Sequence, residues 1–419
     1  MAEPLTRAAA PSPQADFWKF WTGQTISNFG TAFTDFALPL LIFHLTGLPL
    51  TLGITVTTEV LPYLLFGLLI GAWVDRLNRK RLMILTDLAR ALVIALIPLL
   101  ALLGLLNVWW IYAVSFASST LSIGFITAQF AAIPSLVNRD ELVTANGRIQ
   151  ASFSTVNVLG PLIGGILISF LPVPALLLFD AISYLISAGS LALVSRSFNA
   201  NGQPKAPTSI RADLLEGLRY VLRHPIIRST TLMVGLVNVA SVTASAQLVL
   251  FARRWLAASD PQIGWLYAAA GIGVVVFSLA AGPLRKRWSY SIVILGSTML
   301  EGLTISALAL THVYWAALLI WTLNAGMITL STISGLSLIQ LITPNELLGR
   351  VRSVVRVLAW SAIPVGSLLG SLAIQQTQNV GLVYAVCGLL VFSIPVAFAF
   401  TALGRAGREL PQEQKPPAS

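Results

Sequence analysis

Long apolar runs recur along this chain from its amino end almost to its carboxyl end. A helix needs about 20 residues to cross roughly 30 Å of hydrocarbon, and each of these runs is about that long. Because 56% of the 419 residues are hydrophobic and only 10% are charged, the chain has too few polar side chains to cover a soluble protein of this size. The sequence therefore predicts an all-α membrane protein.

Charged and turn residues divide the apolar sequence into twelve predicted spans. The spans cover residues 20–45, 50–72, 82–104, 109–134, 149–170, 174–195, 227–252, 262–284, 289–311, 313–340, 353–376 and 380–403. Lys and Arg gather in the loops on one side of these spans, and the exceptions are Arg90, Arg253 and Arg254. The positive-inside rule then places both termini in the cytosol, in a multi-pass protein of the cell (inner or plasma) membrane. The net charge of +10 thus reflects topology, and no nucleic-acid partner is expected.

The longest polar segment separates two sets of six spans. It predicts an N-terminal half over residues 1–195, a cytosolic central loop over 196–226 and a C-terminal half over 227–419. The halves are predicted to be pseudo-symmetric, because NRDEL at 138–142 resembles TPNEL at 343–347 and a glycine follows each at the same spacing. Two six-span halves related by an internal repeat are typical of secondary transporters, whose substrate site lies near the midplane.

A charged hairpin, GAWVDRLNRKR at 71–81, joins the second and third spans. Its pattern GxxxDRxxRK resembles the cytosolic signature of the major facilitator superfamily, with Asn78 in the place of the usual Gly. Asn tolerates a left-handed backbone better than other non-glycine residues, so we expect Asn78 to make the same tight turn.

The resemblance implies that the hairpin forms a cytosolic gate between the two halves. Gly71 would let its span approach a neighbour closely, and Asp75 would face the amino end of span eleven, close to Arg356. The gate residues are Gly71, Asp75, Arg76, Arg79, Lys80, Arg350 and Arg352. The alternative is that the basic residues of the hairpin only determine topology.

Span five contains a glycine motif, GPLIGG, with Gly160, Pro161, Gly164 and Gly165. It resembles the GPxxGG antiporter motif of the superfamily, found mainly in exporters, although Val156 replaces an earlier Gly of that motif. Closely spaced glycines make a smooth face for helix contact, and Pro161 removes a backbone hydrogen bond and bends the span. Ordinary packing of small residues is the alternative interpretation.

The segment from Phe17 to Leu92 resembles the drug and siderophore efflux branch of the superfamily, related to macrolide exporters, and the likeness extends over nearly the whole chain. This resemblance implies export of a small hydrophobic or amphipathic compound, a drug, macrolide or siderophore, by proton antiport with alternating access. Its partners would be the substrate, protons and the lipid bilayer, and the protein is expected to be a monomer.

Two other functions stay open at this point. A lipid or lysophospholipid transporter of the same fold would also have apolar cavity walls and few charges, and a transport-inactive sensor or scaffold is the third alternative. No Walker P-loop, GxSxG or HExxH sequence occurs, so we expect neither an ATP-driven pump nor an enzyme. No cofactor or metal site is predicted.

Ionisable residues within the spans are functional candidates, because a charge in the bilayer is costly. Asp35 in span one and Glu59 in span two are the proton-coupling candidates. Glu301 in span nine is expected to serve packing or a lipid-side pair. Asp180 is expected to reach outward from span six, and Arg90 to pair with Asp87 in span three.

Uncharged polar residues on the cavity spans are candidates for substrate contact. They are Gln24, Asn28, Thr31, Gln129, Asn157, Asn238 and Gln247. With Asp35, the three candidates of span one share a helix face, which favours a water-lined wall. Hydrogen bonding between helices is the competing explanation for each of these residues.

Overall fold

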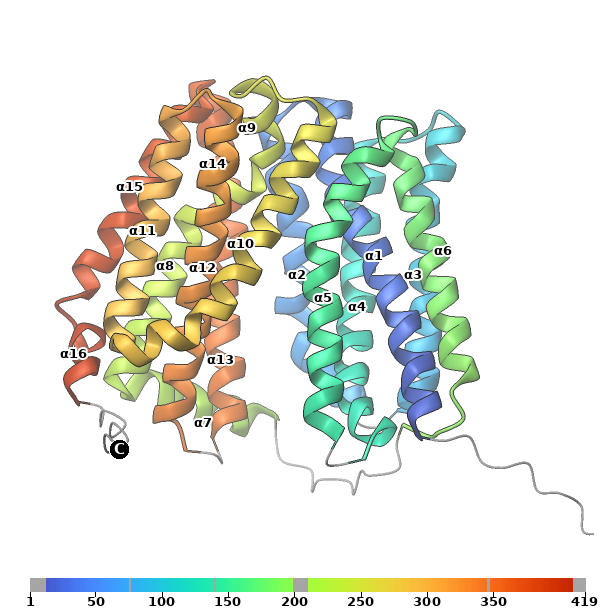
Figure 1. The fold of residues 1–419 in the computed structure, drawn as a ribbon, viewed down its shortest axis with the longest axis horizontal. Helices are drawn as coiled ribbons and strands as arrows, with labels where there is room; N and C mark the ends of the chain where they lie inside the picture. The colour runs from blue at the N-terminus through green and yellow to red at the C-terminus, as the bar shows by residue number, and fades with distance from the viewer. Residues whose placement is uncertain (1–12, 75–76, 139–140, 199–209, 345–346, 410–419) are drawn as a thin grey trace, which may run out of the picture. The chain divides into compact units, whose positions relative to one another are not determined.

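The computed structural model describes residues 13–74, 77–138, 141–198, 210–344 and 347–409, which are almost entirely helical (Figure 1). Twelve segments in these ranges are long and apolar enough to cross a membrane, which confirms the predicted spans and the all-α fold class. The helices are α1 (Pro13–Thr46), α2 (Pro49–Val74), α3 (Arg79–Leu102), α4 (Val108–Leu136), α5 (Leu142–Leu167), α6 (Val173–Leu193), α7 (Ile210–Arg223), α8 (Pro225–Ala246), α9 (Leu248–Arg254), α10 (Asp260–Arg287), α11 (Tyr290–Leu310), α12 (Tyr314–Ile342), α13 (Leu348–Trp360), α14 (Ala362–Thr377), α15 (Val380–Phe398) and α16 (Ala402–Glu409).

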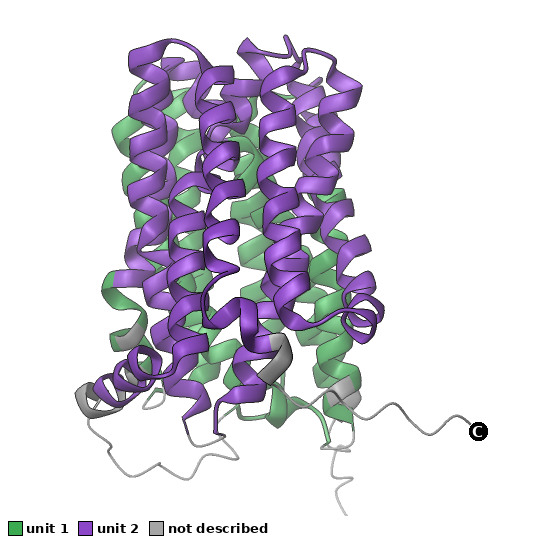
Figure 2. Cartoon of the chain, turned by 90° about the vertical axis from the view of Figure 1, so that its left-hand side faces the viewer, with its two compact units in different colours: residues 1–37, 65–160, 171–204 green, residues 38–64, 161–170, 205–419 purple. Residues whose placement is uncertain are grey.

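Contacts between helices group the chain into two compact units (Figure 2). Unit 1 comprises residues 1–37, 65–160 and 171–204, and unit 2 comprises residues 38–64, 161–170 and 205–419. The helices α1, α2 and α5 therefore pass from one unit into the other. The division of the sequence into halves at 1–195 and 227–419 stays a prediction.

Unit 1 has an apolar core in which α3 packs against α4 and α6. Phe20, Met83, Leu191 and Phe198 are fully buried in it. Because these side chains come from both ends of the sequence of unit 1, their burial fixes α1 and the segment after α6 against α3.

Asn78 begins α3 as its N-cap, so the prediction of a left-handed turn at this position is wrong. Its backbone is extended, with φ −71° and ψ 106°, and its side-chain oxygen accepts a hydrogen bond from the Arg81 N–H at 3.0 Å. A capping Asn satisfies one of the free N–H groups of the first turn and adopts this extended conformation. The hairpin therefore does not need a glycine at residue 78.

Unit 2 depends on glycines where two of its helices cross. A Cβ atom on Gly302 of α11 would lie 2.7 Å from the Gly388 carbonyl oxygen of α15. The reverse distance, from a Cβ on Gly388 to the Gly302 carbonyl oxygen, would also be 2.7 Å. Small residues let backbones approach closely in membrane helices, where dispersion contacts replace the hydrophobic effect between helices.

Span eleven is broken at Ser361, between α13 and α14. Pro364 accounts for the break, because it lacks the N–H that would bond to the Trp360 carbonyl four residues earlier. The neighbouring Ala359 carbonyl accepts a hydrogen bond from the Asn238 side-chain amide of α8 at 2.9 Å. This contact ties α8 to the break.

The predicted central loop contains α7, which is anchored to the helices of unit 2. The Tyr220 hydroxyl donates to the Ile342 carbonyl oxygen at the end of α12, 3.1 Å away. At the start of α13, Arg350 donates a hydrogen bond to the Glu216 carboxylate. The amphipathic sequence of α7 therefore covers the end of unit 2 at which α12 ends and α13 begins.

Candidate functional site

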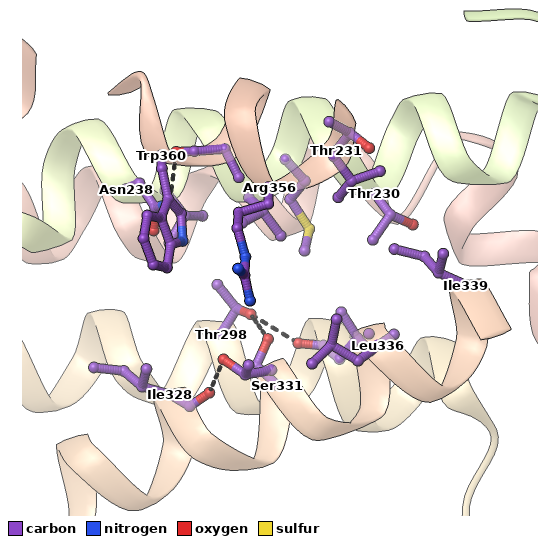
Figure 3. A pocket seen from close by; sticks show the side chains of 18 of the residues that line it. Thr230, Thr231, Asn238, Thr298, Ile328, Ser331, Leu336, Ile339, Arg356 and Trp360 are labelled. Carbon is purple, nitrogen blue, oxygen red and sulfur yellow. Dashed lines mark hydrogen bonds between the residues drawn. The ribbon is translucent and has the colours of Figure 1, made fainter. Parts of the chain in front are cut away.

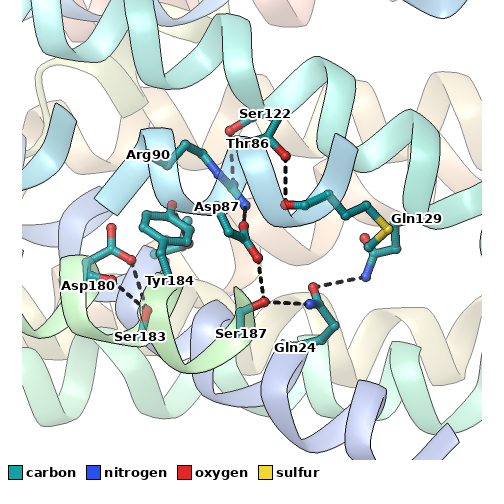
Figure 4. A network of polar contacts seen from close by, with 12 residues as sticks. Gln24, Thr86, Asp87, Arg90, Ser122, Gln129, Asp180, Ser183, Tyr184 and Ser187 are labelled. Atoms are coloured by element: carbon teal, nitrogen blue, oxygen red, sulfur yellow. Dashed lines mark hydrogen bonds and ion pairs between the residues drawn. The ribbon is translucent and has the colours of Figure 1, made fainter. Parts of the chain in front are cut away.

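A chain of polar contacts runs through unit 1 from α4 through α1 and α6 to α3 (Figure 4). The Gln129 amide donates to the Gln24 side-chain oxygen at 3.4 Å, and the Gln24 amide donates to the Ser187 hydroxyl at 2.8 Å. The Ser187 hydroxyl in turn donates to the Asp87 carboxylate at 2.6 Å. Each contact joins two different helices, so the chain of contacts fixes the positions of all four.

The network ends in the predicted ion pair between Arg90 and Asp87, which is confirmed. The Arg90 guanidinium lies 2.5 Å from the Asp87 carboxylate. It also lies 4.2 Å from the ring centroid of Tyr184 and 4.5 Å from that of Phe125. Both charges are almost fully buried, and the aromatic faces provide further stabilisation of the cation.

Asp180 is a further buried carboxylate of unit 1, and the expectation that it reaches outward is wrong. Its side chain is completely buried and accepts hydrogen bonds from the Thr34 hydroxyl at 2.5 Å and the Ser183 hydroxyl at 3.3 Å. Gly30 makes room for it, because a Cβ at Gly30 would lie 2.7 Å from the carboxylate oxygen. The close packing of α1 on α6 thus encloses Asp180.

The network therefore holds two buried carboxylates, Asp87 and Asp180, and one buried guanidinium, Arg90. Asp35 is exposed on α1 and interacts electrostatically with Asp180. Buried charges that are not matched by an opposite charge are costly. Among the three buried groups, Asp87, Asp180 and Arg90, one negative charge is left over, and a proton bound at Asp180 would balance it.

The polar face of α1 is divided between two environments. Gln24 and Thr31 make hydrogen bonds to α6, and the Thr31 and Tyr184 hydroxyls are 3.0 Å apart. These two residues therefore follow the alternative interpretation, in which they form hydrogen bonds between helices. Asn28 is half-buried and Asp35 is exposed, and their place in a cavity wall stays a prediction.

Unit 2 contains a cavity of about 330 Å³ between α8, α11, α12 and α13 (Figure 3). Hydroxyl groups line part of it, and the Thr298 and Ser331 hydroxyls are 3.0 Å apart across two helices. Trp360, next to the break of span eleven, and Asn238 also line the cavity. Of the predicted substrate contacts, Asn238 therefore lines a described cavity.

Three charged side chains line the same cavity: Glu301, Arg352 and Arg356. Glu301 is only 3% exposed and interacts with Ser241 inside the cavity. Of its two expected roles, packing and a lipid-side pair, this burial fits packing and excludes the lipid-side pair. Both arginines are exposed. No ion pair joins any of the three to another described residue within 4.0 Å.

The other predicted contacts of unit 2 lie in different surroundings. Gln247, at the break between α8 and α9, is completely buried and donates to the Pro49 carbonyl oxygen at 2.9 Å and the Ser371 hydroxyl at 2.8 Å. It therefore links helices. Glu59 is half-buried on α2. In unit 1, Asn157 is exposed on α5.

The glycine motif of α5 packs closely against neighbours in both units. In unit 1, a Cβ on Gly160 would lie 2.5 Å from the Ala32 Cβ of α1. In unit 2, a Cβ on Gly165 would lie 3.1 Å from the Gly264 Cα of α10. Pro161 and Gly164 are buried between these two contacts.

The gate residues are described only in part, because Asp75 and Arg76 lie outside the described residues. Within unit 1 no described atom lies within 4 Å of a Cβ built on Gly71, so no neighbour in its own unit makes the expected close approach. Arg79 donates to two carbonyl oxygens, of Ala131 and Phe198, at 3.3 and 3.2 Å.

Lys80 makes the corresponding contacts at the end of α6. Its ammonium donates to the Val194 carbonyl oxygen at 2.6 Å and to that of Ala192 at 3.2 Å. Cations are favourable at helix carboxyl ends, where carbonyl groups lack partners within the helix. These two basic residues of the hairpin therefore bind the carboxyl-terminal regions of α4 and α6.

A polar cluster in unit 2 joins the α1–α2 connection to α9 and α10. The Asp260 carboxylate binds the Arg253 guanidinium and lies 3.4 Å from the His44 imidazole. Arg254 donates to the Gly47 carbonyl oxygen at 2.7 Å. The two arginines that depart from the positive-inside pattern thus have partners at this end of unit 2.

Comparisons with known proteins agree with this architecture. The chain is 24% identical over 383 residues to the uncharacterized MFS-type transporter YfiS of Bacillus subtilis (strain 168), covering 88% of this chain and 89% of YfiS. It is 26% identical over 387 residues to the enterobactin exporter EntS of Escherichia coli O1:K1 / APEC, covering 90% and 89% of the two chains.

Solved structures show the same fold at lower sequence identity. A bacterial homologue of the human lysosomal transporter Spinster matches with a TM-score of 0.73 and 15% identity, over 98% of this chain and 100% of that chain. A bacterial homologue of the iron transporter ferroportin matches with a TM-score of 0.70 and 16% identity, over 93% and 100%. Because the family model described as transmembrane secretion effector matches residues 6–411, the chain belongs to this family of major facilitator superfamily membrane transporters.

Proposed function

We propose that this protein exports a small hydrophobic or amphipathic compound in exchange for protons. The enterobactin exporter is a relative over 90% of the chain, and the GPxxGG motif of α5 favours the export direction. The observation that carries the proton-coupling part is the charge arrangement of unit 1, in which Asp35 lies exposed beside the buried Asp180.

Proton exchange follows from the excess of carboxylates in the network. A proton that reaches Asp35 from an aqueous cavity would lower the repulsion with Asp180, and the same proton could pass to Asp180. Because Thr34 binds Asp180 at 2.5 Å and is next to Asp35 in α1, protonation would change the contacts between α1 and α6. A shift of these two helices is a physical means of linking protonation to the shape of the cavity.

Alternating access is supported by contacts inside unit 2. Residues 38–64 and 161–170 come from the predicted N-terminal half but pack with α8, α10 and α14, through contacts such as Gln247 to Pro49 and Gly165 to Gly264. With cytosolic termini, these contacts lie on the outer side. We therefore propose an outer gate that is closed in this conformation, as expected for the inward-facing state in which the Spinster and ferroportin homologues were solved.

The proposal also includes the oligomeric state, the orientation and the cytosolic gate. The protein would act as a monomer in the cell membrane with both termini in the cytosol, and Gly71, Asp75, Arg76, Arg79, Lys80, Arg350 and Arg352 would form the cytosolic gate. Arg79 and Lys80 support this role indirectly, because they position the hairpin against α4 and α6.

The test begins by identifying what the protein exports. Exported metabolites and drug tolerance are compared in cells with and without the protein, and export of an identified compound is then measured in vesicles with an imposed pH gradient. Asp35→Asn is expected to abolish gradient-driven export and Asp35→Glu to retain part of it. Glu59→Gln tests the second coupling candidate in the same assay.

Two results would contradict the proposal. If the Asp35→Asn protein exported the compound at the wild-type rate under the pH gradient, Asp35 would have no coupling role. If collapse of the proton gradient left wild-type export unchanged, the antiport mechanism itself would be wrong.

A further inference from the structure

We infer that the cavity between α8, α11, α12 and α13 binds an amphipathic compound that carries an anionic group, with Arg352 and Arg356 as the anion-binding residues. This inference deepens the proposed function, because it names the chemical class of the exported compound. The cavity volume of about 330 Å³ lies within the range of about 300–1,000 Å³ that is usual for small-molecule sites.

The cationic part of the site is built on one face of α13. Arg352 and Arg356 are four residues apart, so both lie on the same side of the helix, and both line the cavity. Figure 3 shows the Arg356 side chain pointing across the cavity toward Thr298 and Ser331. Two guanidinium groups without an ion-pair partner among the described residues repel each other, and a bound carboxylate or phosphate would remove that repulsion.

An aromatic surface adjoins the cationic part. Trp360 is one helical turn beyond Arg356, and its ring centroid lies 5.2 Å from the Arg356 guanidinium carbon. Tyr63 packs edge-on against the same ring, with centroids 5.9 Å apart, which limits its motion. Val237 and Ile328 add apolar surface to the cavity. A planar or apolar body can therefore pack beside the anionic group.

Glu301 determines how the ligand is oriented. It lies one turn along α11 from Thr298, almost completely buried beside Ser241. Its side-chain oxygens can accept a hydrogen bond from a hydroxyl or amine of the ligand. The anionic group is thus expected at Arg352 and Arg356, and a hydrogen-bond donor of the ligand at Glu301.

The test measures equilibrium binding of two fluorescent probes to the full-length protein in nanodiscs of zwitterionic lipid. Dansylglycine carries a carboxylate, and dansylamide shares the same aromatic body without it. We expect Arg356→Gln and Arg352→Gln each to weaken dansylglycine binding about tenfold, which corresponds to about 1.4 kcal/mol, and to leave dansylamide binding unchanged.

Two further variants sharpen the result. Arg219→Gln removes an exposed guanidinium from α7, outside the cavity, and is expected to leave both affinities unchanged. Glu301→Gln keeps the size and the hydrogen-bonding capacity of this buried side chain and is expected to leave the dansylglycine affinity close to the wild-type value. The contrast between the Arg356 and Arg219 variants distinguishes loss of a cation in the cavity from loss of positive charge elsewhere, and the thermal midpoint of each variant checks for loss of folding.

Three outcomes would overturn the inference. The first is that dansylglycine shows no saturable binding to the wild-type protein. The second is that Arg356→Gln weakens the binding of dansylglycine and of dansylamide equally. The third is that Arg356→Gln and Arg219→Gln weaken dansylglycine binding equally. No proton gradient is present in this experiment. A failure of anion binding therefore leaves the vesicle test of proton-coupled export unaffected, and the reverse also holds.

Discussion

The backbones of Gly165 and Gly264 are nearly in contact where α5 crosses α10. A Cβ on Gly264 would lie 2.8 Å from the Gly165 Cα and 2.7 Å from the Pro161 carbonyl oxygen. The glycine motif thus allows close packing of two helices within unit 2, although its segment belongs to the N-terminal half predicted from the sequence. If the outer gate opens during transport, this contact has to separate.

Gly264→Ala should therefore weaken the proposed outer gate. Forcing a methyl group into a tight contact typically costs about 1–3 kcal/mol, and separating the helices avoids that cost. We expect a lower thermal midpoint or a larger outward-open population, measured in detergent by unfolding and by labelling of introduced cysteines. Gly282→Ala is the matched control, because it is on the same helix and its Cβ meets no described atom within 4 Å. An equal effect of both variants would exclude the packing explanation.

Removing one partner of the buried pair in α3 should be strongly destabilising. Arg90→Gln leaves the Asp87 carboxylate without its cation in the core of unit 1, which typically costs about 3–5 kcal/mol. The double variant with Asp87→Asn should recover part of that loss, because no unpaired charge remains. Arg81→Gln, an exposed position on the same helix, controls for loss of a positive charge. The thermal midpoints of the wild type, Arg90→Gln, the double variant and Arg81→Gln are compared. A wild-type midpoint for Arg90→Gln would contradict the prediction.

The sequence predicted the features that depend on local chemistry. Twelve spans follow from hydropathy alone, and the Arg90–Asp87 pair follows from their spacing of three residues in one helix. The break at Ser361 was also within reach, because Pro364 is visible in the sequence. The cavity beside this break could not be predicted, because it depends on how α8, α11 and α12 pack against α13.

Two acidic residues, Asp180 and Glu301, show why the surroundings of side chains within the spans could not be predicted. Asp180 is near the start of its span, which suggests an outward position, but Gly30 and Thr34 of α1 enclose it. Glu301 is on a helix expected at the periphery, yet its side chain turns into the cavity. Burial in both cases depends on residues more than 50 positions away, and no sequence period carries that information.

Asp260 should help to hold the outer gate closed, because it binds Arg253 and lies beside His44. Asp260→Asn removes the negative charge between two basic side chains and is expected to increase opening. Leu52→Cys provides the probe, since Leu52 is buried on α2 near this cluster's end of unit 2, and Cys387 is the one native cysteine. With Cys387→Ser as background, maleimide labelling of residue 52 should be several-fold faster in the Asp260→Asn protein.

The control for this experiment is a buried position in another part of unit 2. Ile305→Cys lies in α11, where the native side chain is 1% exposed, and its labelling should not change. Faster labelling at both positions would indicate general unfolding and not gate opening. Unchanged labelling at residue 52 would exclude Asp260 from the gate.

Asn78 caps α3, and this role predicts a specific order of stability among its substitutions. As an N-cap of α3, it should be replaceable by Asp without loss, because Asp also accepts the Arg81 N–H bond. Asn78→Gly should cost a few tenths of a kcal/mol and Asn78→Ala about 1 kcal/mol. A left-handed turn would reverse this order, making Gly the most stable and Asp no better than Asn. Thermal midpoints of the three variants check the capping role, and the reversed order would contradict it.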